Sequence, residues 1–511
     1  MKKSTKALAL ILASMLAMSS FASCSDSGTN SETTGNTDET AASVSGSDEA
    51  EETAETEEER IKPNIPTSAD YGGDEINFLF WELASWANTV RQCRDIYSDG
   101  ISGEAINDTV YNRNIKIEEA YNVKIALETM AIDQISSAVS QEVTAGADTY
   151  DVVYPRLYEA PSLYQNGYFY NLRKIPNIDL TQPWYDQSSI EAMDCGGYLP
   201  AVESAININD KDATAAVAFN KTIASNAQLE DIYTLVREGK WTYDKLSELA
   251  EATYQDLNGD GEMTPDEDLY GFLGANDVMS AFYFGSGGRI VTHDDSGLFS
   301  FTYGSERDIS ATVAVVNLMN QKWFMNHHMI DNTDDIYYTQ LFEEGHGLFF
   351  WMRLDEVTNM RASDVDFGIL PTPKYEESQD SYYNMVSQHT TGILSVPISI
   401  TGDKLSEVGM IIEALSAESY YTLIPEYIET SLKTKNSRDA ESADMLDIII
   451  NNRVFDPVLY YNFGSFADSF QSLGKENNTD ISSFLQKKQK IVEKSMEKTI
   501  NGLIAANEAQ Q

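Results

Sequence analysis

Cysteine, positive charge and long apolar runs are all scarce in this sequence of 511 residues. Three cysteines without a CxxC or Cys/His spacing exclude a disulfide framework and a zinc module, although Cys93 and Cys195 could still pair. With 81 Asp plus Glu against 35 Lys plus Arg, the formal net charge of -46 repels phosphate backbones and anionic lipids, which excludes nucleic-acid binding. No apolar stretch reaches the roughly 20 residues of a transmembrane helix. The fold must therefore rest on burial, for which 42% hydrophobic residues suffice in two or three domains.

The amino terminus carries an export signal. Lys2, Lys3 and Lys6 precede a short apolar run over 7–18, and small residues follow directly before Cys24. This arrangement resembles the lipobox of bacterial lipoproteins, which implies a signal peptide over 1–23 and a lipid on Cys24. The resemblance places the protein on the extracellular face of the membrane, held by its lipid anchor alone. The alternative is an ordinary signal peptide cleaved near Cys24 without lipid.

A low-complexity acidic segment follows. Residues 25–60 contain twelve acidic residues, one basic residue and a single large aliphatic residue, Val44. Such a composition cannot bury a core and repels itself, so we expect residues 24–69 to form the lipidated cysteine and a disordered linker.

Catalytic motifs are missing from the chain. The sequence has no GxSxG elbow, no phosphate-binding GxxxxGK[ST] loop, no HExxH and no GxGxxG after the first expected strand. A glycosidase-type carboxylate pair stays possible, because acidic residues are so abundant that no single pair stands out. We therefore expect a protein that is not an enzyme, with a secreted glycoside hydrolase as the alternative.

The body of the chain alternates between apolar strands and amphipathic helices. Strands are expected over 76–81, 123–128 and 151–154, with helices over 109–121 and 132–145 between them. This βαβαβ order gives parallel strands, and ligands bind beyond the carboxyl ends of such strands. Further expected elements are helices over 241–255, 309–325, 404–416, 443–452 and 481–506, a strand over 367–373 that ends at a proline-controlled turn, and a short strand over 392–397.

Residues 256–267 match the full EF-hand loop pattern D-x-[DN]-x-[DN]-G-x5-E. Gly261 stands at the sharp turn and Glu267 at the bidentate twelfth position. The sequence predicts a structural Ca²⁺ held by oxygens of Asp256, Asn258, Asp260, Glu262, Thr264 and Glu267. An acidic turn without metal is the alternative, since no second loop completes the usual pair.

Aromatic and arginine side chains gather at the expected strand ends. Flat aromatic faces stack on sugar rings, and charged neighbours bind hydroxyl groups. For each aromatic taken alone, a place in the core is the simpler interpretation. As a set, the candidates for a ligand site are Trp81, Glu82, Trp86, Arg156, Tyr158, Tyr283, Trp351 and Arg353.

Several short stretches, in their order and spacing, resemble the extracellular solute-binding proteins of bacterial ABC transporters, in the group of maltose-binding-like receptors. The stretches are 150–154 with Asn166-Gly167, 218–221 with 239–246, 270–272 leading to Gly287-Gly288, 342–350, 367–374 and 413–415. The resemblance implies an α/β fold of the type II periplasmic-binding-protein class, with two lobes, each a mainly parallel sheet flanked by helices, joined by a hinge.

The resemblance also implies a division of the chain and a function. The first lobe would hold 70–205 and 332–396, and the second 206–331 and 397–511. The implied protein is a monomeric receptor that captures a carbohydrate, expected to be an oligosaccharide, and delivers it to an ABC permease. A surface adhesion or scaffold protein is the remaining alternative, and the identity of the solute cannot be read from the residues.

Overall fold

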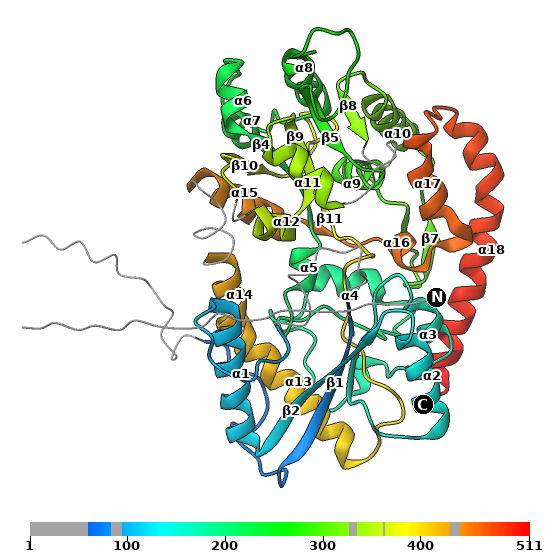
Figure 1. The fold of residues 1–511 in the computed structure, drawn as a ribbon. Helices are drawn as coiled ribbons and strands as arrows, with labels where there is room; N and C mark the ends of the chain where they lie inside the picture. Colours follow the sequence, from blue (N-terminus) through cyan, green and yellow to red (C-terminus); the bar gives the residue numbers. More distant parts are fainter. Residues whose placement is uncertain (1–59, 83–94, 327–334, 361–362, 430–439, 511) are drawn as a thin grey trace, which may run out of the picture. The chain divides into compact units, whose positions relative to one another are not determined.

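The computed structural model describes residues 60–82, 95–326, 335–360, 363–429 and 440–510. In this part of the chain the strands form two larger sheets and two short two-stranded pairs. Each larger sheet is the centre of one lobe (Figure 1).

The first lobe is built on a three-stranded parallel sheet. Its central strand β1 (Asp74–Glu82) pairs with β2 (Val123–Ala131) on one side and β3 (Val152–Tyr154) on the other. Helix α1 (Ala105–Tyr121) connects β1 to β2, and α2 (Ile135–Ala145) connects β2 to β3. Residues 78–81 of β1 are buried, as a central parallel strand requires. The expected βαβαβ unit is confirmed.

The second lobe is built on a five-stranded sheet of order β10-β4-β9-β5-β8. Pairing is parallel between β9, β5 and β8 but antiparallel between β10, β4 and β9, so this sheet is mixed rather than mainly parallel. Its strands are β4 (Ala215–Asn220), β5 (Tyr270–Gly274), β8 (Phe324–Asn326), β9 (Gly347–Arg353) and β10 (Phe367–Leu370).

Helices cover both sheets. Early in the chain these are α3 (Pro161–Gln165), η1 (Leu172–Lys174), α4 (Gln187–Met193), α5 (Asn209–Asp212), α6 (Lys221–Asn226), α7 (Ile232–Arg237), α8 (Tyr243–Thr253) and α9 (Val278–Gly285). Later come α10 (Glu306–Met319), α11 (Asp335–Glu343), α12 (Leu354–Asn359), α13 (Asp403–Tyr421), α14 (Leu423–Pro425), α15 (Ala440–Asn451), α16 (Pro457–Tyr461), η5 (Phe463–Ser465), α17 (Phe466–Lys475) and α18 (Ile481–Glu508). The two short pairs are β6 (Val291–His293) with β7 (Phe299–Phe301) and β11 (Asn384–Met385) with β12 (Arg453–Val454).

Two sequence-based assignments of single elements are corrected. The helix expected over 309–325 ends at Met319, and residues 324–326 form strand β8 instead. The strand expected over 392–397 forms isolated bridges with Val153, Arg156, Phe169 and Val202. This segment therefore runs between parts of the first lobe rather than extending its sheet.

The division into lobes also differs from the prediction. Strands β9 and β10, which lie in 332–396, pair within the sheet of the second lobe, because β9 lies between β4 and β5. Helix α13, which lies in 397–511, packs against α1 of the first lobe. The chain thus crosses to the second lobe after residue 208, returns to the first near residue 389, and lies against the second again at α15, which packs on β10.

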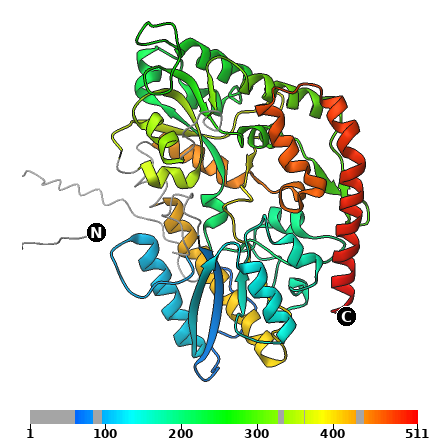
Figure 2. The same ribbon diagram turned by 45° about the vertical axis from the view of Figure 1, so that its right-hand side comes forward.

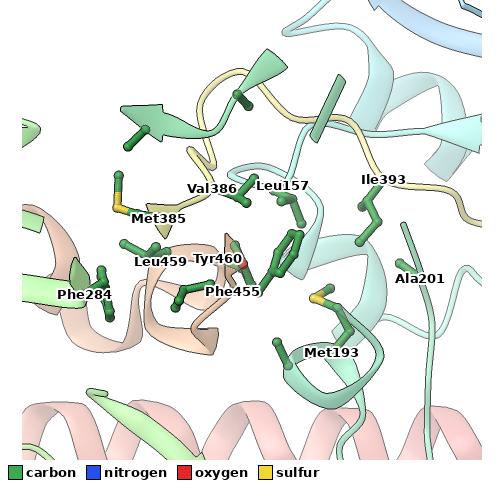
Figure 3. Packing of buried hydrophobic residues seen from close by; sticks show 14 of the residues in the cluster. Leu157, Met193, Ala201, Phe284, Met385, Val386, Ile393, Phe455, Leu459 and Tyr460 are labelled. Carbon is green, nitrogen blue, oxygen red and sulfur yellow. The ribbon is translucent and has the colours of Figure 1, made fainter. Parts of the chain in front are cut away.

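The apolar core is continuous through the junction of the lobes. One cluster of buried residues includes side chains of both sheets and of the segments that connect them. Figure 3 shows this packing, with Leu157, which follows β3, beside Tyr460 of α16. Ile393 and Ala201, on the two connecting segments, belong to the same cluster. The junction is therefore a packed interior rather than a pair of bare linkers.

Helix α18 runs along one side of both lobes (Figures 1 and 2). It contacts α10 and β7 of the second lobe and α3 of the first. Near its end, Asn507 Oδ1 accepts from Asn171 Nδ2 at 3.0 Å and Gln510 Nε2 donates to Phe169 O at 2.9 Å. No helix among the described residues is both long and apolar enough to cross a membrane.

Candidate ligand-binding site

Three of the aromatic residues predicted to stack on a ligand lie in the core. Trp81 is 1% exposed, Tyr283 0% and Trp351 4%. Trp81 packs on Phe80 and fills the space beside Gly392, where an added Cβ would lie 2.7 Å from its Nε1. Tyr283 packs against aromatic rings of the second lobe and donates to Asp308 Oδ1 at 3.0 Å. The prediction that these rings are ligand platforms is wrong for this structure, because protein atoms cover their faces.

Two charged candidates have local partners. Arg353, at the end of β9, forms ion pairs with Asp355 and Glu356 of α12, at 3.6 and 3.3 Å. Glu82, at the end of β1, is exposed and accepts from Thr129 Oγ1 at 2.9 Å. Glu82 therefore reaches solvent at a strand end as predicted, whereas Arg353 is held within its own lobe. Trp86 lies outside the described residues.

Arg156 and Tyr158, the two remaining candidates, are brought together just after β3. We call Arg156, Tyr158, Glu159, Gln388 and His389 the Tyr158 cluster. Arg156 forms a two-point ion pair with Glu159 and donates from Nη1 to His389 O at 3.3 Å. The rings of Tyr158 and His389 lie 4.9 Å apart, and the Arg156 guanidinium lies 5.7 Å from the Tyr158 ring. Gln388 Nε2 and His389 Nε2 are 3.0 Å apart.

The Tyr158 cluster stands where the lobes meet. Arg156 and Tyr158 follow β3 of the first lobe, and His389 lies on the segment that returns from β11 of the second. Two groups act electrostatically on His389 from the second lobe and the carboxyl-terminal part of the chain, Asp277 next to α9 and Asp468 in α17. Tyr158 is 36% exposed, so part of its ring is open to solvent. The cluster is thus an aromatic and polar surface formed by the first lobe and by the segment that joins it to the second.

Burial lowers the pKa of His389 below its ordinary value, although the charge of Asp277 opposes this effect. The imidazole is therefore neutral at neutral pH and can both donate and accept a hydrogen bond. The Arg156 charge is matched by Glu159, so the cluster presents hydrogen-bonding groups without a large net charge. Such a surface suits an uncharged, hydroxyl-rich ligand that stacks on the Tyr158 ring.

Sequence reasoning missed Glu159, Gln388 and His389. The three-residue spacing of Arg156 and Glu159 is a weak local signal for an ion pair. Nothing in the sequence connects His389 to Tyr158, because their contact depends on how the return segment crosses between the lobes. On this segment Gln388 Oε1 and Thr390 Oγ1 are buried without a hydrogen-bond partner among the described residues.

The predicted calcium loop connects α8 to β5 and is exposed over most of its length. Asp256 accepts from the backbone of Gly259 and Gly261 at 2.6 and 2.9 Å. Gly261 has a φ of +87°, which a residue with a Cβ rarely adopts. Asp268 closes the loop by accepting from Leu257 N and Thr264 N at 2.9 and 2.7 Å. The chain thus wraps around its own acidic side chains.

The donor set of this loop suits a hard cation. Asn258 Nδ2 bridges two carboxylates, 3.2 Å from Asp260 and 3.0 Å from Glu267. The side-chain NH₂ group of Asn258 thus lies at the point on which these carboxylate oxygens converge. If the Asn258 side chain rotates, its amide oxygen can face the same point, as a Ca²⁺ ligand must. In the described parts of the chain, no three His, Cys, Asp or Glu side chains are grouped closely enough to hold a metal. The loop therefore brings the oxygens near one another without forming a complete site.

Of the cysteines, Cys195 is buried and has no disulfide partner within the described ranges, and burial raises the pKa of its thiol to about 11. Cys24 and Cys93 lie outside the described residues. Two hollows, of about 400 Å³ between α17 and α18 and about 250 Å³ beside α6 and α7, contain none of the predicted site residues.

No protein-family model matches the chain, and no curated protein matches it in sequence. Solved structures do match. A cyclo/maltodextrin-binding protein complexed with maltotetraose superposes with a TM-score of 0.53 at 13% identity, over 86% of this chain and 98% of that one. A cyclic alpha-maltosyl-1,6-maltose binding protein from Arthrobacter globiformis gives 0.52 at 13% identity, over 85% and 99%. An ABC transporter solute-binding protein from Agrobacterium radiobacter K84 in complex with ribitol gives 0.50 at 12%, over 87% and 100%. These likenesses confirm the predicted two-lobed fold.

Proposed function

We propose that this chain is a receptor that captures a carbohydrate, most simply an oligosaccharide, between its two lobes. The observation that carries the proposal is the Tyr158 cluster, in which a part-exposed aromatic ring lies between Arg156 of the first lobe and His389 of the segment that returns from the second lobe. A ligand that touches both lobes favours the closed arrangement, which is how a two-lobed receptor gains affinity. The choice of ligand class is supported by two structures with the same fold, one complexed with maltotetraose and one of a cyclic alpha-maltosyl-1,6-maltose binding protein.

The proposal extends to the setting of the receptor. A lipid on Cys24 would hold the chain at the extracellular face of the membrane, and the acidic segment over 25–60 would let the lobes reach a permease. The ABC importer is proposed as the partner because the fold is shared with an ABC transporter solute-binding protein. In this setting the protein transfers its ligand without chemical change.

We also propose a structural Ca²⁺ in the loop over 256–267. Support comes from the loop pattern and from the convergence of Asp260 and Glu267 on Asn258. The loop follows α8 and precedes β5, so a bound ion would stabilise the second lobe and leave the Tyr158 cluster untouched.

Thermal-shift screening of the mature protein against oligosaccharides, polyols and peptides tests the proposal. The expected result is a rise in melting temperature with one class of oligosaccharide, since a ligand that binds only the folded state stabilises it. Chromatography of the same samples after long incubation should return the oligosaccharide intact. Cleavage of the glycan would identify a hydrolase instead, and a response to peptides alone would contradict the carbohydrate assignment.

A further inference from the structure

A group of five charged residues lies buried where the lobes join. We call Asp186, Glu203, Asp210, Lys211 and Arg453 the junction cluster. Asp210 is 0% exposed, Glu203 1% and Lys211 7%. The side chains of Arg453 and Asp186 are 9% and 15% exposed. Charges buried to this degree must be balanced, because each unpaired ion costs several kcal/mol in desolvation.

Arg453 connects the two lobes through this cluster. It lies on β12, which pairs with β11 of the second lobe, and its Nη2 donates to Asp186 in front of α4 of the first. The same Nη2 lies 3.3 Å from Asp210 Oδ2 on α5, the short helix where the chain crosses between lobes. Lys211 Nζ donates to both oxygens of Asp210, at 2.9 and 3.1 Å. Each cation thus has a carboxylate partner.

Glu203 is the one carboxyl group of the junction cluster without a cation of its own. The residue lies on the connecting segment between two bridges, Val202 with Leu394 and Tyr185 with Ser204. Neither carboxyl oxygen has a hydrogen-bond partner among the described residues. Three carboxyls face two cations, and the other two carboxyls already hold them. An ionised Glu203 would therefore be an uncompensated buried charge.

We propose that Glu203 is a neutral carboxylic acid that balances the junction cluster, and that loss of its proton loosens the connection between the two lobes. An ionised Glu203 would compete with Asp186 and Asp210 for Arg453 and Lys211. The contact between Arg453 and Asp186, which crosses from one lobe to the other, would be weakened. The proton is thus coupled to the hinge on which any opening or closing of the lobes depends.

The surroundings of Glu203 agree with a neutral acid. Burial raises its pKa well above the ordinary value, Asp210 adds to the rise, and Lys211 opposes it. The charged and titratable groups that face it come from β3, α3, the start of α4, α5, β12 and α16: Tyr154, Tyr164, Asp186, Asp210, Lys211, Arg453 and Tyr460. Only two of these carry positive charge, and both are engaged by aspartates.

The sign of the pH dependence follows from this raised pKa. The folded state holds a proton that the unfolded state releases above the ordinary pKa of a glutamate, so stability falls as pH rises toward the folded pKa. Over that range the unfolding equilibrium constant of the wild-type protein should increase up to tenfold per pH unit relative to Glu203→Gln, which has no proton to lose. Glu191→Gln, an exposed change on α4, should give a pH profile parallel to that of the wild type.

The experiment is denaturant unfolding of the mature protein and the two variants between pH 5 and pH 9. Parallel profiles for wild type and Glu203→Gln would overturn the proposal. Glu203→Met is neutral and of similar size, and it should give the same pH profile as Glu203→Gln. It serves as the neutral variant if the buried amide of Glu203→Gln, lacking a hydrogen-bond partner, prevents folding. Failure of both neutral variants to fold would also overturn the proposal, because a neutral side chain of that size is all it requires.

Hydrogen exchange locates the effect. After correction for the intrinsic pH dependence of exchange, amides over 199–208 and 386–396 should lose protection at alkaline pH in the wild type but keep it in Glu203→Gln. Protection lost evenly over both lobes would contradict a role at the junction.

Discussion

The calcium-like loop and the junction cluster satisfy the same kind of side chain in different ways. In the loop over 256–268, the carboxylates of Asp256, which is part-exposed, and Asp268, which is buried, accept from backbone N–H groups of their own segment. In the junction cluster, carboxyls from separate segments are buried and depend on two cations. The loop is thus a local device that can form or open alone, whereas the junction cluster exists only when both lobes are in place.

The strongest test of this difference is removal of the cation at the junction. Arg453→Met leaves Asp186 and Asp210 short of a buried partner, so we expect a loss of about 3 to 5 kcal/mol in unfolding free energy. Arg237→Met removes an exposed arginine that pairs with Glu441 and Asp444, and should cost far less, because solvent screens exposed ion pairs. Denaturant unfolding measures both, and equal losses would show that burial is not what makes Arg453 important.

Next in size is the effect of truncating the buried aromatics. Trp81→Ala and Tyr283→Ala should each lower the unfolding free energy without ligand by about 3 kcal/mol or more, because they leave cavities in the core. Tyr158→Ala, at a part-exposed ring, should cost much less. Similar melting temperatures for all three variants would return Trp81 and Tyr283 to the ligand surface.

Two aspartates should respond to pH with opposite signs. Burial raises the pKa of Asp456, beside the junction, to about 6, so its stabilisation is complete below about pH 4 and is lost as pH rises toward 6. A shift of this size corresponds to about 2 to 3 kcal/mol. In the loop, the N–H of Thr264 lowers the pKa of Asp268, whose stabilisation is therefore lost as pH falls. Denaturant unfolding as a function of pH checks both. Asp456→Asn should remove part of the loss of stability with rising pH, and Asp268→Asn part of the loss with falling pH. The opposite assignment of the two effects would refute the comparison.

A smaller effect is expected from chelation. If Ca²⁺ binds the loop, a chelator should lower the melting temperature of the wild type, because removing the ion removes the stability that it adds to the folded state. Glu267→Gln should lose this response, while its ligand affinity stays close to that of the wild type. The same chelator response in both proteins would leave the loop as an acidic turn.

The sequence predicts the elements that depend on local contacts better than those that depend on distant contacts. The βαβαβ unit, the late helices and the wrapped loop depend on periodicity and turn residues within one segment, and they were predictable. The placement of β9 between β4 and β5 was not, because a buried apolar strand carries no sign of the sheet it joins. For the same reason Trp81 was predicted to meet a ligand at a strand end, but it is buried beside Gly392, which lies far along the chain.

The residues of the candidate site also differ in whether local or distant contacts place them. Tyr158 and Arg156 follow a predicted strand, so their place at its end could be foreseen. The contribution of His389 could not, because it comes from the segment that returns from the second lobe. Glu203 was hidden among many acidic residues, and only its burial without a hydrogen-bond partner distinguishes it.

Calorimetric titration of the mature protein with the oligosaccharide found by screening tests the central claim most directly. Tyr158→Ala should weaken binding about 5- to 150-fold, which corresponds to about 1 to 3 kcal/mol for the loss of one stacked ring, with little change in stability without ligand. Tyr150→Ala is the matched control, since Tyr150 precedes β3 and Tyr158 follows it, and it should bind as the wild type does. Unchanged affinity in Tyr158→Ala, or no binding of any oligosaccharide by the wild type, would contradict the account.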